Sequence, residues 1–164
     1  MSEPTTGGLA TYIEKTKQFS PNARLVLIYS AFTGLAFGVF RFLFNFYVLS
    51  LGDAYNEAFI GSLQTASSFA SILMALPAAY LAERFSQKKI MIHTALISSL
   101  AMIGLVLFPF RALLILFNMV AGVSMSMRQV AMAPFLMANT SENERQWVFS
   151  FNFGLMTVSG FFGN

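Results

Sequence analysis

Five apolar runs dominate this sequence, and each is long enough to cross the ~30 Å hydrocarbon core of a bilayer as a helix. They lie at about residues 25–51, 58–81, 90–108, 112–138 and 147–164. Charged residues make up only 10% of the chain and hydrophobic residues 56%, whereas a soluble domain has about 25% charged residues. The sequence therefore predicts an all-α membrane protein with about five transmembrane helices.

The short polar segments between these runs predict its orientation. The segment from Ala79 to Lys89 holds three cationic residues, Arg84, Lys88 and Lys89, and short cationic loops stay on the cytoplasmic side. In the resulting topology seven of the ten Lys and Arg residues lie in cytoplasmic segments, and the outer segments hold only Arg111. We therefore predict a cytoplasmic N-terminus.

Residues 1–24 form a polar leader with neither an apolar core nor a small-residue cleavage site, so it is not a secretory signal. Its apolar positions allow two interpretations, a short helix lying on the cytoplasmic surface or a frayed tail. Ser20 and Pro21 then predict a helix start, with Ser as N-cap and Pro in the first turn.

Composition excludes several classes of site. The chain has no cysteine and a single histidine, His93, which excludes a disulfide framework, a thiolate or multi-histidine metal site and a Cys nucleophile. No segment gathers a nucleophile with a base or a phosphate-binding loop, so we expect neither a cofactor nor enzymatic activity. The net charge of +3 belongs to the loops, and no basic stripe with interleaved aromatics predicts nucleic-acid binding.

The cationic segment also carries a family resemblance. Major facilitator superfamily transporters have a signature loop between helices 2 and 3: Gly, three residues, Asp, Arg or Lys, any residue, Gly, any residue, then two basic residues. Six residues occupy these positions here in register, with Ala for Gly, Glu for Asp and Ser for Gly: Ala79, Glu83, Arg84, Ser86, Lys88 and Lys89. The chain therefore resembles this superfamily from about residue 24 to residue 164.

The resemblance implies a fold of two six-helix halves around a central cavity, each half made of two inverted three-helix repeats. Residues 25–164 would supply helices 1–5 of the N-terminal half, and the expected partners are the bilayer, a small solute and a C-terminal half of the same protein. The expected location is a prokaryotic plasma (inner) membrane. The alternative is a five-span protein that does not transport.

Two arginines lie within the predicted spans, Arg41 in the first and Arg128 in the fourth. A charged side chain near the centre of an isolated helix costs roughly 2.5–3.5 kcal/mol on insertion scales, so such residues usually face a cavity or a partner. The resemblance implies that both helices line the translocation path. Three further polar residues are candidate cavity residues beside them: Asn45, Asn118 and Gln129.

Guanidinium groups suit carboxylate and phosphate, so one interpretation is a site that attracts an anionic solute. The other is that one or both arginines bond carbonyls or pair with another helix for assembly. Multidrug export is the alternative transport function. Proton-coupled drug exporters of the superfamily carry an Arg four residues before a Gly in helix 4, and here Asn118 precedes Gly122, which weakens that interpretation.

Three further predictions concern local structure. The resemblance implies that the signature segment acts as a gate, in which Glu83 contacts a helix end of the other half. Residues 139–146, with Glu142, Glu144 and Arg145, are interpreted as a solvated cytoplasmic loop. The polar residues of the second span are interpreted as helix-packing groups rather than ligands: Gln64, Ser67, Ser68 and Ser71.

Overall fold

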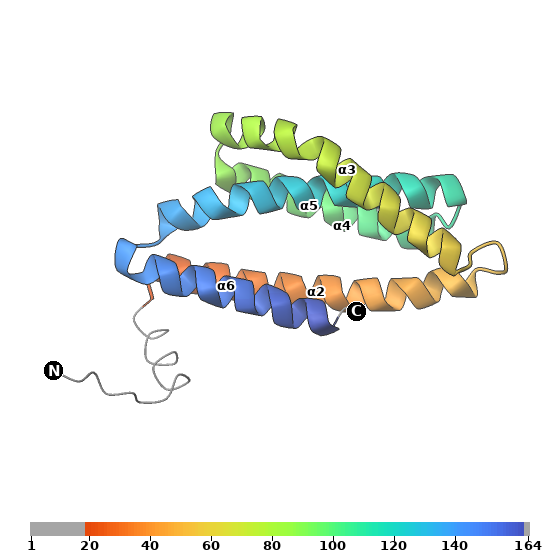
Figure 1. Cartoon of the computed structure of the whole chain (residues 1–164), viewed down its shortest axis with the longest axis horizontal. Coiled ribbons are helices and arrows are strands. Elements are labelled where there is room, and N and C mark those ends of the chain that lie inside the picture. The colour runs from red at the N-terminus through yellow and green to blue at the C-terminus, as the bar shows by residue number, and fades with distance from the viewer. Residues whose placement is uncertain (1–18, 163–164) are drawn as a thin grey trace. The chain divides into compact units, whose positions relative to one another are not determined.

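The computed structural model describes residues 19–162, and helix is the only regular secondary structure in that part of the chain. Figure 1 shows its five helices. They are α2 (Pro21–Ser50), α3 (Glu57–Arg84), α4 (Gln87–Leu107), α5 (Arg111–Asn139) and α6 (Glu142–Phe162). The surface helix considered for the polar leader falls outside the described residues.

Four of these helices are long and apolar enough to cross a membrane, namely residues 23–50, 57–84, 87–107 and 111–139. The all-α membrane fold expected from the sequence is thereby confirmed. The fifth predicted span, 147–164, overlaps α6 (Glu142–Phe162). This helix has 21 residues but does not meet the same criterion, because its first turns are polar. The fifth span therefore stays a prediction.

Polar caps set the helix ends, and they explain why the helices extend beyond the apolar runs. The α2 helix begins after Ser20, whose Oγ accepts the backbone N–H of Ala23 at 3.2 Å, as the sequence predicts. Asn56 caps α3 in the same way, with Oδ1 accepting from the N–H of Phe59 at 3.1 Å. Each cap satisfies a backbone donor that has no partner inside its own helix.

The helices form two compact units. Unit 1 comprises the chain up to Arg41 together with Leu136–Asn164, and unit 2 comprises Phe42–Phe135. The division passes through α2 and α5, so each of these helices contributes turns to both units.

Two glycines allow close helix packing in unit 2, where α5 lies beside α3 and α4 (Figure 1). A Cβ on Gly104 of α4 would lie 2.6 Å from the ring of Phe117 on α5. A Cβ on Gly122 of α5 would overlap the carbonyl of Ser67 on α3 and lie 2.8 Å from its Oγ. Small residues at such positions let helix backbones approach closely, which favours helix association in membranes.

Tyrosines and a cation–π contact hold the predicted outer end of unit 2. Tyr47 donates its hydroxyl to the carbonyl of Val106 at 2.9 Å, joining α2 to α4. Tyr55 donates to the carbonyl of Pro109 at 2.7 Å and so ties together the α2–α3 and α4–α5 links. The guanidinium of Arg111 lies 4.7 Å from the ring centre of Phe59, within the range of a cation–π interaction.

In unit 1, α6 lies beside the first turns of α2 (Figure 1). Phe19, just before α2, packs edge-to-face on Phe151 of α6 with ring centres 5.9 Å apart. The backbone N–H of Ser20 donates to the carboxylate of Glu144 at 2.8 Å. The start of α2 and the start of α6 are therefore in direct contact.

Candidate functional site

The first two candidate cavity residues lie one turn apart on α2. Arg41 is exposed and is the last residue of unit 1 on this helix, whereas Asn45 is half-buried and belongs to unit 2. Their four-residue separation places them about 40° apart around the helix axis. They therefore share a face of α2, as their spacing predicts.

The other three candidates lie on the part of α5 that belongs to unit 2. Asn118 donates its amide to the carbonyl of Leu114, one turn earlier, at 2.9 Å. Arg128 is half-buried and Gln129 is exposed. Asn118 and Gln129 are eleven residues apart, which places them within about 20° of one face but about 16 Å apart along the axis. One small solute therefore cannot contact both at once.

Part of the polar face predicted on this helix packs against a neighbouring helix. Ser71 of α3 donates its hydroxyl to the carbonyl of Gly122 on α5 at 2.8 Å, one turn along α3 from the close approach at Ser67. The interpretation of Ser67 and Ser71 as helix-packing groups is confirmed. Gly122 serves the same contact, so the polar face of α5 is not devoted to a cavity at that level.

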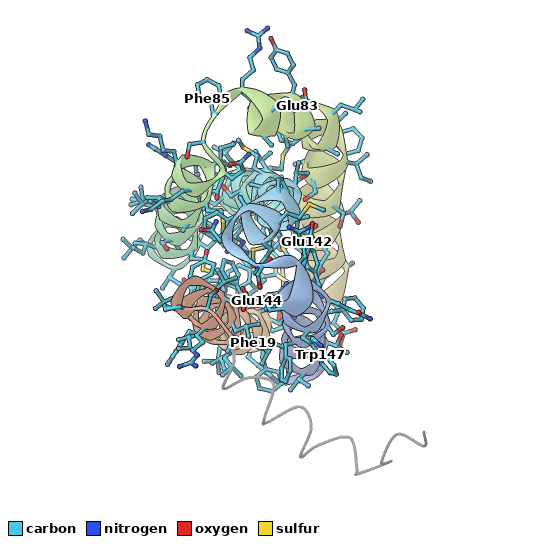
Figure 2. All side chains as sticks on the ribbon, turned by 90° about the vertical axis from the view of Figure 1, so that its left-hand side faces the viewer. Phe19, Glu83, Phe85, Glu142, Glu144 and Trp147 are labelled. Carbon is cyan, nitrogen blue, oxygen red and sulfur yellow. The ribbon has the colours of Figure 1, made fainter. Side chains whose placement is uncertain are left out.

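The signature segment, residues 79–89, covers the end of α3, a link of two residues, Phe85 and Ser86, and the start of α4. Most of its residues are exposed, and Figure 2 shows Glu83 and Phe85 at that end of α3. Ala79, Glu83 and Arg84 belong to the last turns of α3. The Arg84 guanidinium lies 4.7 Å from the ring centre of Tyr80.

The departures from the family's glycines carry no backbone strain here. Ser86 has a φ of −59°, and Ala79 lies within α3, so neither position requires the left-handed conformation that favours glycine. The first turn of α4 carries Lys88 and Lys89, both exposed, at a helix end where the macrodipole disfavours cations.

The second link departs from the sequence-based prediction. Residues 139–146 are not a solvated loop, because α6 already begins at Glu142 and only Thr140 and Ser141 connect it to α5. Glu144 supplies the carboxylate half of a capping box, because it accepts the N–H of Ser141 at 2.8 Å. The spacing Ser-x-x-Glu is itself the signal that predicts this start, although the polar composition of the stretch favours a loop.

Glu144 is the residue that sequence reasoning placed wrongly. Its side chain is only 9% exposed, and its second oxygen accepts the N–H of Ser20 at 2.8 Å. Figure 2 shows Glu144 near Phe19 in unit 1. Two helix N-termini, those of α2 and α6, therefore share one carboxylate.

The surroundings of Glu144 lower its pKa. Burial of the carboxylate acts to raise the pKa, but the backbone and hydroxyl hydrogen bonds from Ser141 and Ser20 act in the opposite direction, and the pKa falls below its ordinary value of about 4.5. These donors bind the ionised form and so favour it. Glu144 is therefore a carboxylate, and an acceptor only, at neutral pH.

Comparison with protein families matches residues 25–164 to a family described as Major Facilitator Superfamily. The matched range begins within the first turns of α2 and runs through all five described helices. Neither the curated proteins nor the solved structures yield a match to the chain.

Proposed function

Because the chain belongs to the Major Facilitator Superfamily, we propose that it is part of a secondary active transporter that moves a small solute by alternating access. Membership confirms the resemblance carried by the α3–α4 link and makes the protein an integral membrane protein of a transporter family. The proposed location is a prokaryotic plasma (inner) membrane, since cationic short loops on one side are typical of such proteins.

The proposed solute is anionic. The observation that carries this proposal is the position of Arg41 and Arg128, each far from the ends of a helix that is long and apolar enough to span a membrane. Arg41 lies nine residues before Ser50, about 14 Å along the axis, and Arg128 lies eleven residues before Asn139, about 17 Å. Guanidinium groups at such depth are costly unless they serve a cavity or a partner, and they suit carboxylate and phosphate.

Gln129, next to Arg128, and Asn45, one turn from Arg41, would donate or accept hydrogen bonds to the polar part of the solute. Asn118 lies about 15 Å from Arg128 along α5. Its proposed contact with the solute therefore belongs to another stage of the passage.

The α3–α4 link is proposed to act as a gate. Glu83 and Arg84 are exposed at the end of α3, where they are accessible to a second, C-terminal half of the same protein. A carboxylate is stabilised at the N-terminus of a helix, so Glu83 would hold such a helix end when the predicted cytoplasmic side is closed.

The experiment compares Arg41→Ala and Arg128→Ala with Arg24→Ala, a control near the start of the same α2 helix. Uptake of inorganic phosphate, succinate and lactate is measured in vesicles, beside the lipophilic cation tetraphenylphosphonium. We expect loss of anion uptake in the first two variants and normal uptake in the control. Unchanged anion uptake in Arg41→Ala would overturn the anionic solute.

The same panel tests two alternatives. Multidrug export has some support in the exposed phenylalanines of α2, such as Phe32 and Phe46, although surfaces facing lipid have the same composition. It predicts movement of tetraphenylphosphonium that is indifferent to Arg41. A membrane protein that does not transport predicts no movement of any probe.

A further inference from the structure

Three helix ends meet at two adjacent residues in unit 1. The two carboxylate oxygens of Glu144 accept the N–H groups of Ser20, before α2, and Ser141, before α6, both at 2.8 Å. Arg145 donates from its guanidinium to the carbonyl of Met137, in the last turn of α5, at 3.2 Å. Consecutive side chains thus reach the starts of two helices and the end of a third.

The two charges have the signs that these helix ends favour. Helix N-termini carry partial positive charge and helix C-termini partial negative charge, so a carboxylate suits α2 and α6 and a guanidinium suits α5. The third residue after Ser20 is Ala23, which cannot supply the acceptor that a capping box provides, and the first turn of α2 has no acidic residue. Glu144 supplies that acceptor from another helix.

Burial of Glu144 makes it costly to separate the start of α2 from the start of α6. Glu144 is only 9% exposed, and a buried carboxylate that loses a hydrogen-bond donor is left with an unsatisfied charge. A second contact joins the same two helices, because Phe19 is buried against Phe151. Thr140, between α5 and α6, is buried and donates to the carbonyl of Leu136 at 2.6 Å, which closes the last turn of α5.

We propose that Glu144 and Arg145 are positioning residues of the transport cycle, which keep the predicted cytoplasmic ends of α2, α5 and α6 together in both the inward-open and outward-open states. This inference rests on the proposed alternating-access function. Its consequence is that the cycle moves these three ends as one block and leaves the contacts of Glu144 and Arg145 unbroken.

The first test joins the block covalently. Ser20 and Ser141 bind the two oxygens of one carboxylate, and the sequence contains no cysteine, so Ser20→Cys with Ser141→Cys gives a defined pair in this part of the protein. The full-length double variant is oxidised, or linked with a short bifunctional maleimide, and uptake of the probe that the wild type transports is measured. Each single variant serves as a control for the loss of the serine hydroxyl.

The linked protein is expected to retain most of the uptake rate of the unlinked double variant. If oxidation abolishes uptake and reduction restores it, the two helix starts must separate during transport, and the proposal is wrong. Absence of uptake in the wild type would instead remove the proposed function.

The second test does not depend on transport. Glu144→Gln removes the charge and one acceptor oxygen, and Glu142→Gln is the matched control, since Glu142 is exposed in the same turn of α6. The melting temperature of the purified full-length protein is expected to fall by several degrees in the first variant and to stay unchanged in the control. Equal melting temperatures would show that the carboxylate does not hold the block together.

The uptake kinetics of Glu144 variants also distinguish a positioning role from solute binding. Because the contacts of Glu144 are to helix starts, Glu144→Gln is expected to lower the maximal uptake rate several-fold and leave KM unchanged, with Glu144→Asp recovering part of the rate. A change in KM with a normal maximal rate would place the carboxylate in contact with the solute and overturn its role as a positioning residue.

Discussion

The α3–α4 and α5–α6 links have the same length and the same residue directly before the next helix. The first turns of the two helices that follow differ in charge and burial. Each has two residues and ends in a serine, Ser86 or Ser141. The third residue after that serine is Lys89 in α4 and Glu144 in α6. The α4 start has no side-chain cap, whereas at the α6 start the carboxylate of Glu144 accepts the N–H of Ser141 and also that of Ser20.

The difference shows how one local design serves two purposes. A carboxylate at the third position favours the helix start and can be buried there, because the backbone donors satisfy it. Lysines in the first turn oppose the helix dipole, and Lys88 and Lys89 are exposed beside the exposed α3–α4 link. The buried carboxylate of Glu144 suits the proposed role of holding helices in place, and the exposed α3–α4 link suits the proposed role of a gate.

Glu144→Ala should have the largest effect on stability. The substitution removes two hydrogen bonds to a charged group, each of which contributes about 1.5–3 kcal/mol, so we expect the free energy of unfolding in detergent to fall by about 3 kcal/mol. Chemical denaturation of the purified protein measures this. Glu83→Ala is the counterpart at the exposed link and should change the free energy of unfolding by less than about 0.5 kcal/mol. Equal losses in the two variants would show that the links do not differ in their contribution to stability.

Acidification should remove part of the same stabilisation. The pKa of Glu144 is lowered in the folded protein, so its contribution is complete above the ordinary pKa of about 4.5 and is lost as the pH falls through the folded value. The melting-temperature difference between wild type and Glu144→Gln should therefore shrink when the pH is lowered from neutral to below the pKa of Glu144 in the folded protein. A difference that stays constant with pH would mean that the charge of Glu144 contributes nothing.

Glu83→Gln should lower the uptake rate without lowering the melting temperature, whereas Glu144→Gln should lower both. Loss of an anion from a helix end corresponds to about 1 kcal/mol, so the maximal uptake rate should fall roughly fivefold while the melting temperature stays unchanged. Paired uptake and thermal-unfolding measurements on the same preparations check this. A fall in melting temperature with normal uptake would make the exposed link structural rather than a gate.

Lys88→Gln should produce the smallest effect, and its sign is opposite. Removing a cation from the first turn of α4 should raise the free energy of unfolding by about 0.3 kcal/mol. Turnover per correctly inserted molecule, compared with the fraction of inverted molecules, separates two roles for the residue. If Lys88 only sets the orientation, turnover remains normal; if it also holds the gate, turnover falls.

Hydrophobic patterning predicts the membrane helices well but not their ends. The four spans from 25 to 138 follow from apolar runs, but the helices extend beyond them. The α3 helix for example begins at Glu57, where Asn56 caps it, so a polar cap rather than hydrophobicity sets this end. The same reasoning misassigned residues 139–146, where the capping box was present in the sequence but composition favoured a loop.

Long-range contacts lie beyond any local pattern. Ser20 and Glu144 are 124 residues apart, so no spacing rule predicts that they share a hydrogen bond. Helical spacing does place Arg41 with Asn45 on one face of α2. It does not predict which residue packs against Gly122, because the close approach of Ser67 depends on how α3 packs on α5. The sequence therefore predicts which residues are candidates for the site, but it does not predict how the helices pack around them.

The two helices that pass from one unit to the other differ in how easily they bend. In α5 the crossing at residues 135–136 comes directly after Pro134, which has no N–H for the carbonyl of Val130 and so provides a natural point of flexure. In α2 the crossing at Arg41 and Phe42 has no proline nearby. Bending is therefore easier in α5, at the turn that holds Pro134, than in the part of α2 that carries Arg41, the residue proposed to bind the solute.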